Sequence, residues 1–254
     1  MENTGQLFHI ESRRQELRRG PAGNSEWGVI NDEEHIDPGD AALVVCDVWD
    51  DHWCRISAER LEQLVPRMSK VVVTARNRGM LVIHAPSETM DFYARSPARN
   101  RAIESPMVEL PRDIDHLDPP LPIDDSDGGC DAVDNPYPPH TRKWTRQHDG
   151  IPIDERKDAI TDKGEEVYRL LRAQGRTHLF ILGVHTNMCI LNRSFGIKQM
   201  VRWGVEVRLI RDLTDSGYSP SSSPYVSHDE GTNLVVGYIE KFWCSTVMSD
   251  CLLR

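Results

Sequence analysis

The hydrophobic positions along the chain predict alternating strands and helices. Residues 41–46 form a continuous apolar run of strand length, as expected for a strand buried on both faces. Apolar residues then recur at spacings of three and four over residues 57–78, which predicts a helix that ends at Gly79. Further strands are predicted at 80–83, 142–145, 177–182, 205–210 and 243–248, and further helices at 162–175, 187–200 and 227–241. This order predicts an α/β fold, a Rossmann-like three-layer α/β/α structure with a mainly parallel six-stranded sheet.

Two segments fall outside this alternation. Residues 1–40 are polar and are predicted to be an N-terminal extension that packs on the main domain, residues 41–254. Residues 86–140 are rich in proline and show no sustained period, so they are predicted to be a long irregular insertion. Loops of this length usually form lids or partner surfaces.

Charge and composition exclude several classes of protein. The 254 residues contain 30 Lys and Arg against 40 Asp and Glu, a net charge of −10, which argues against a nucleic-acid or anionic-membrane partner. No apolar run approaches the ~20 residues of a membrane span. The start of the chain lacks the pattern of a secretory signal, which predicts a cytoplasmic protein, with a trimmed signal as the open alternative.

The six cysteines are widely spaced and are predicted to be mostly free thiols, and no zinc-binding pattern is present.

Three chemically complementary residues fall at predicted strand ends. Asp47 follows the first strand, Lys143 lies in the strand after the insertion, and Cys189 opens the helix at 187–200. A helix N-terminus and a nearby ammonium group both lower the pKa of a thiol, and a carboxylate can accept its proton. The backbone amides of His185 and Cys189 are expected to bind an oxyanion. Each residue alone has an ordinary structural explanation, and the three together favour catalysis.

The segments that carry these residues resemble the isochorismatase-like cysteine hydrolase superfamily. They are Val45-Cys46-Asp47, Arg142-Lys143-Trp144, Leu182 to Cys189, and Ile210 to Ser216. The resemblance covers about residues 41–248. It implies that Asp47 is the general base and acid, Lys143 the electrostatic partner and Cys189 the nucleophile, with Lys157 as a competing lysine. It also implies a cis peptide bond between Val184 and His185 and a homo-oligomer, a dimer or a tetramer.

The resemblance implies hydrolysis of the C–N bond of a small amide or ureide substrate, without a cofactor. Isochorismatases that cleave a vinyl ether lack the cysteine, so Cys189 favours C–N chemistry. Two alternatives remain open. One is a family member without turnover that acts as a binding or interaction protein, and the other is a redox sensor that uses Cys189 as an oxidisable thiolate.

Aromatic, imidazole and amide groups near the predicted strand ends are expected to bind the substrate. These residues are Trp49, His52, His84, Trp144 and Asn187. They suit a small, flat, polar amide, although large aromatic residues also simply fill the space between strand ends and a lid. Nicotinamidases of this superfamily hold a metal after the second strand, where this chain has His84, Glu88 and Asp91. These three do not match the metal-binding pattern, so no metal is predicted.

Overall fold

A computed structural model describes residues 7–254 and contains one eight-stranded sheet. The strand order is β2-β1-β8-β7-β6-β3-β4-β5, and all neighbours from β8 to β5 run parallel. The strands are β1 (Phe8–Arg19), β2 (Ser25–Ile36), β3 (Ala41–Cys46), β4 (Leu81–Ala85), β5 (Ala159–Ile160), β6 (His178–Val184), β7 (Glu206–Asp215) and β8 (Ser245–Val247). The predicted α/β class is confirmed, and the predicted number of six strands is wrong.

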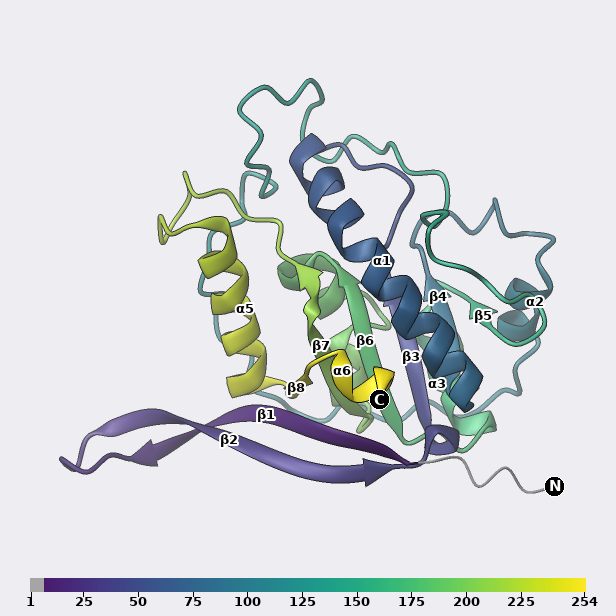
Figure 1. Cartoon of the computed structure of the whole chain (residues 1–254), viewed down its shortest axis with the longest axis horizontal. Coiled ribbons are helices and arrows are strands. Elements are labelled where there is room, and N and C mark those ends of the chain that lie inside the picture. The colour runs from purple at the N-terminus through teal and green to yellow at the C-terminus, as the bar shows by residue number, and fades with distance from the viewer. Residues whose placement is uncertain (1–6) are drawn as a thin grey trace.

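Helices cover both faces of the sheet (Figure 1). Residues of α1 and α6 pack on one face, and residues of α3, α4 and α5 pack on the other. The helices are α1 (Arg55–Arg78), α2 (Pro97–Ile103), α3 (Gly164–Ala173), α4 (Ile197–Arg202), α5 (His228–Phe242) and α6 (Asp250–Leu253). None of the helices in residues 7–254 is long and apolar enough to cross a membrane.

The two additional strands come from the N-terminal segment. β1 and β2 pair antiparallel along their whole length, and β1 also pairs with β8 at the edge of the sheet. The inner end of this hairpin buries Phe8, Ile10 and Ile36 in the core, whereas its outer half reaches past α5, away from the layers (Figure 1). The segment predicted to be an extension lying over the domain is therefore an extension of the sheet itself, and residues 1–6 lie outside the described part.

The predicted strand at 142–145 is wrong, because these residues are irregular in the structure. The edge of β4 is paired instead with β5, in which Ala159 and Ile160 are both fully buried. An apolar pair suits this position better than Arg142 and Lys143, whose charges would have to be buried. The helix expected at 187–200 is also divided, into a π-helical turn at Thr186–Ile190 and α4.

Candidate active site

Asp47 and Cys189 meet at the carboxyl ends of two neighbouring strands. Asp47 follows β3 directly, and Cys189 lies in the π-helical turn after β6. The Asp47 side chain is fully buried, and its Oδ1 accepts a 2.7 Å hydrogen bond from the Ser87 amide. The Cys189 thiol lies close enough to the Asp47 carboxylate for each group to change the pKa of the other. The predicted carboxylate and thiol are thus neighbours in the structure.

Gly183 allows the two strands to approach each other here. It stands opposite Cys46 in the register of β3 and β6, with a φ of +127°. A Cβ atom at this position would lie 1.9 Å from the Cys46 carbonyl oxygen. Only glycine therefore fits at this contact, directly before the turn that carries Cys189. The Val184–His185 peptide bond that follows is cis.

The cation beside Asp47 is Arg193 and not Lys143. Arg193 Nε lies 2.8 Å from Asp47 Oδ2. Lys143 instead forms a 3.0 Å ion pair with Asp51, and its ammonium group also lies over the ring of Tyr137. The structure therefore brings together Asp47 and Cys189, as expected from the sequence, and puts an arginine where a lysine was expected. Lys157, the competing lysine, has no contact with either residue among those described.

The ionisation of this group differs from the sequence-based expectation. Burial raises the pKa of the Cys189 thiol, and the Asp47 carboxylate raises it further, against the opposing effect of Arg193. Burial likewise raises the pKa of Asp47, while Arg193 counteracts it. The expected low-pKa thiolate is therefore absent from the resting site, because the thiol is desolvated and faces a carboxylate. Cys189 is held as a thiol with its proton acceptor already in place.

A cavity of about 200 Å³ opens beside the Cys189 sulfur. Trp49, His52 and Trp144 line it, as predicted, and Trp49 and Trp144 stack with ring centroids 4.3 Å apart. Burial lowers the pKa of His52 to about 3 and that of His185, which also lines the cavity, to about 4. Both imidazoles are therefore neutral at pH 7. Trp53, which leaves the same strand as Trp49, also lines the cavity, and the lining residues that the sequence did not single out include Ser57, His140, Met188, Arg193 and Gly217.

The residues just before Cys189 have different roles. The His185 backbone amide lies near the Cys189 sulfur and opposes the rise in its pKa that burial causes. The Asn187 side chain is buried and is already hydrogen-bonded on both sides. It donates to Asp125 and to the Gly217 carbonyl oxygen, and it accepts from the Gly217 amide. Asn187 therefore fastens the loop after β7 to the turn and has no free group for a substrate.

His84, another predicted substrate ligand, lies in the core and does not line the cavity. Its two ring nitrogens lie 2.9 Å from Gln147 Oε1 and 3.0 Å from Asp158 Oδ2. Asp158 also receives hydrogen bonds from the Arg76 guanidinium group, the shortest of 2.6 Å. This buried network ties the segment before β5 to α1 and β4, so the role of His84 is structural.

Replacing Asp158 by asparagine is expected to lower the free energy of unfolding by about 3 kcal/mol, because Arg76 and His84 lose a buried anionic partner. Burial opposes ionisation of Asp158, but hydrogen bonds from His84 and Arg76 outweigh it and lower its pKa. The carboxylate therefore stabilises the protein above its unfolded pKa near 3.8, and this contribution is lost as the pH falls through the lower folded value. Urea titrations should show that the free energy of unfolding of Asp158→Asn lies below that of the wild type at pH 7, and that this difference is smaller at pH 3. An equal difference at the two pH values would contradict the ionic role. The exposed Asp149→Asn variant is the control.

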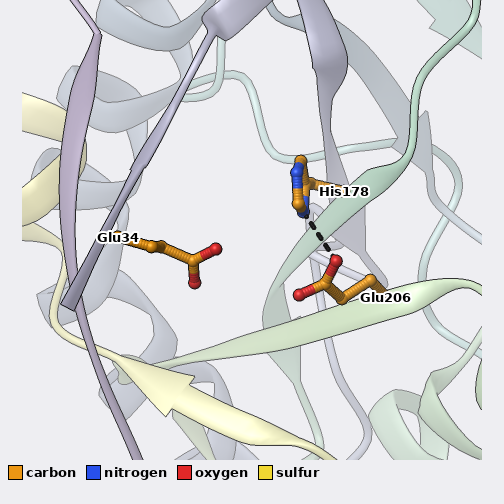
Figure 2. A group of neighbouring side chains, drawn as sticks. All are labelled: Glu34, His178 and Glu206. Atoms are coloured by element: carbon orange, nitrogen blue, oxygen red, sulfur yellow. Dashed lines mark ion pairs between the residues drawn. The ribbon is translucent and has the colours of Figure 1, made fainter. Parts of the chain in front are cut away.

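One cluster of potential metal ligands is present among residues 7–254, far from Cys189. It consists of Glu34, His178 and Glu206, and it lies where β6 and β7 begin (Figure 2). The guanidinium group of Arg208 contacts all three of these side chains. Arg208 is thus a resident cation that already pairs with both carboxylates, so the cluster is an ion-pair network. His84, Glu88 and Asp91, which do not match the metal-binding pattern in sequence, do not form such a group in the described part of the chain.

A disulfide attaches the insertion to the wall of the cavity. Cys54, next to Trp53, is bonded to Cys130, while Cys46, Cys189, Cys244 and Cys251 are free. The predicted free thiols are thus confirmed for four of the six cysteines. Disulfides are rare in cytosolic proteins, so this pair lends no support to the predicted cytoplasmic location, which stays a prediction.

Solved structures with a similar fold include a cysteine hydrolase and a candidate isochorismatase. A cysteine hydrolase from Pseudomonas syringae pv. phaseolicola 1448A is similar with a TM-score of 0.53 and 15% identity, over 86% of this chain and 93% of that one. A candidate isochorismatase from Burkholderia xenovorans LB400 is similar with a TM-score of 0.50 and 13% identity, over 83% of this chain and 84% of that one. The chain has the isochorismatase-like fold. No protein-family model matches the sequence, and no curated protein matches it either. At these identities the similarity concerns the isochorismatase-like fold and not the substrate.

Proposed function

We propose that the protein is a cysteine-dependent hydrolase that cleaves the C–N bond of a small amide or ureide. The observation that carries this proposal is the position of Asp47 beside both the Cys189 thiol and Arg193, at the edge of a cavity. A buried carboxylate next to a thiol can take its proton as the sulfur attacks. Such a group is suited to acyl transfer.

The reaction proceeds in two stages. Asp47 takes the Cys189 proton while the sulfur attacks the substrate carbonyl, and the His185 and Cys189 backbone amides stabilise the oxyanion. The C–N bond then breaks, and Asp47 returns the proton to the departing nitrogen, which leaves as ammonia or an amine. In the second stage Asp47 removes a proton from water, and hydroxide attack on the thioester releases the acid and restores the thiol.

Arg193 has an electrostatic role in this scheme. Burial alone would lower its pKa, but Asp47 and the Cys189 sulfur raise it, so the guanidinium group stays charged throughout. It balances the negative charge that moves between the carboxylate and the sulfur, and it takes no part in proton transfer. The raised pKa of Cys189 also counts against the redox-sensor alternative, because sensor cysteines have low pKa values.

Release of ammonia or amine from a panel of small amides and ureides tests the proposal. The wild-type protein is expected to hydrolyse at least one member, and Cys189→Ala is expected to hydrolyse none. Mass spectrometry after rapid quenching should show the acyl group on the Cys189 peptide. Equal hydrolysis by Cys189→Ala would refute the proposal, and a silent panel together with a Cys189 that iodoacetamide does not alkylate would favour a binding protein.

A further inference from the structure

The cavity beside Cys189 has an unusual balance of charge. Its lining residues include three tryptophans and two histidines that are neutral at pH 7, His52 and His185. The carboxylate and guanidinium side chains in its wall are those of Glu88 and Arg193. The electrostatic character of the cavity therefore depends on the groups with which Glu88 and Arg193 pair.

The positive charge of Arg193 is shared between two carboxylates. Arg193 Nε lies 2.8 Å from Asp47 Oδ2, and its terminal nitrogens lie 3.5 Å from Glu88 Oε1. One guanidinium group balances one carboxylate, so this group of three carries an excess negative charge when Asp47 is ionised. The nearby Arg142 binds the Glu88 carbonyl oxygen but does not line the cavity. An anionic substrate would thus meet a cation that already has partners.

The backbone of Glu88 is fixed in a conformation that non-glycine residues rarely adopt. Its φ is +67°, its amide donates a 3.0 Å hydrogen bond to Asp162, and its carbonyl oxygen accepts one from Arg142. Such conformations cost free energy and are concentrated at functional sites. The carboxylate is held at the cavity by these contacts and remains half exposed, accessible to a ligand.

The aromatic wall supplies the second feature of a cation site. Trp49, Trp53 and Trp144 line the same cavity as Glu88, and indole faces attract cations. Trp49 already has the guanidinium carbon of Arg193 6.0 Å from its ring centroid. Trp53 and Trp144 therefore form the part of the wall that suits a positive group of a ligand.

We propose that the substrate carries a positively charged nitrogen group, such as an ammonium or guanidinium, which binds between Glu88 and the rings of Trp53 and Trp144 while the scissile carbonyl lies at Cys189. This inference rests on the proposed function, because it assumes that Cys189 is the reacting group. It makes Glu88 the residue that selects cationic over anionic substrates. Neutral substrates of the same size are expected to bind more weakly than cationic ones.

Charged thiol reagents test the inference without a known substrate. Methanethiosulfonates transfer an alkylthio group to a cysteine sulfur, so that a disulfide forms and methanesulfinate leaves. The rates at Cys189 are measured by peptide mass spectrometry for the cationic aminoethyl, the anionic sulfonatoethyl and the neutral methyl reagents. Relative to glutathione, the ratio of cation rate to anion rate at Cys189 is expected to be about tenfold higher. Glu88→Gln should lower this ratio about tenfold, and Glu16→Gln on the distant hairpin should leave it unchanged.

The outcomes separate the two proposals. In the first case the neutral reagent labels Cys189, but the ratio of cation rate to anion rate equals that of glutathione or is unchanged in Glu88→Gln. The substrate inference is then wrong, and the hydrolase proposal stands. If none of the reagents labels Cys189, the sulfur is inaccessible and both proposals fall. A measurement on the wild-type protein guards against misfolding of the variant: raising the salt from 20 to 500 mM should reduce the cation preference, because exposed charges are screened. A preference that salt does not reduce would contradict the role of Glu88.

Discussion

Replacing Arg193 by glutamine is expected to slow hydrolysis by roughly 10²- to 10³-fold, the usual effect of removing one electrostatic contact to the reacting groups. Arg193 lowers the pKa values of both Asp47 and Cys189, which burial raises. Without this cation both values rise further, since both groups are acids whose charged forms the guanidinium group stabilises. Less of the protein then has an ionised Asp47 ready to accept the thiol proton at neutral pH.

The same variant should shift the pH dependence of Cys189 alkylation by iodoacetamide to higher pH, and this measurement requires no substrate. Arg193→Lys retains the charge and should show an intermediate shift. Lys143→Ala is the matched control, because Lys143 pairs with Asp51 and does not line the cavity. If Lys143→Ala impairs the reaction and Arg193→Gln does not, the assignment of the cation from the structure is wrong. Thermal melting of each variant shows whether the fold is retained.

Removing the disulfide, by replacing both Cys54 and Cys130 with serine, is expected to lower the free energy of unfolding by about 4 kcal/mol. The bond joins residues 76 positions apart, and a cross-link of that span removes much of the conformational freedom of the unfolded chain. It also fixes the loop that packs Gly128 against Trp53 in the cavity wall. Loss of the disulfide is therefore expected to lower the stability of the fold and to alter the shape of the cavity.

Guanidinium chloride titrations of the wild-type protein, with and without a reductant, measure this effect. The wild-type midpoint should fall when the reductant is present, and the midpoint of the double serine variant should be low in both conditions. If the reductant leaves the wild-type midpoint unchanged while mass spectrometry shows reduced cysteines, the disulfide contributes no stability.

Much of the central sheet could be predicted because its elements have local signatures. The apolar run of β3 was predicted at its observed bounds, Ala41–Cys46, and α1 was predicted to within two residues of its start. The hairpin of β1 and β2 could not be recognised in this way, because only its inner end is buried. Its position also depends on pairing with β8, more than two hundred residues away along the chain.

The candidate site was predictable where it follows from strand order. Asp47 and Cys189 follow strands that are neighbours in a parallel sheet, so their proximity could be expected. Arg193 lies four residues after Cys189, and helical spacing could have placed it on the same side of the turn. Lys143 was misplaced because it lies in an irregular segment whose path no periodicity defines. The pairing of Cys54 with Cys130 also depends on that path, and cysteine spacing alone does not fix it.

The tryptophans of the cavity give the protein a built-in optical signal. Three of the six tryptophans in the chain, Trp49, Trp53 and Trp144, line the space beside Cys189. A molecule that enters this space replaces water at the indole rings and changes their fluorescence emission. Occupancy of the cavity can thus be followed in the unlabelled protein, including variants that have lost Cys189 and convert nothing. Affinity and turnover can therefore be measured as independent quantities.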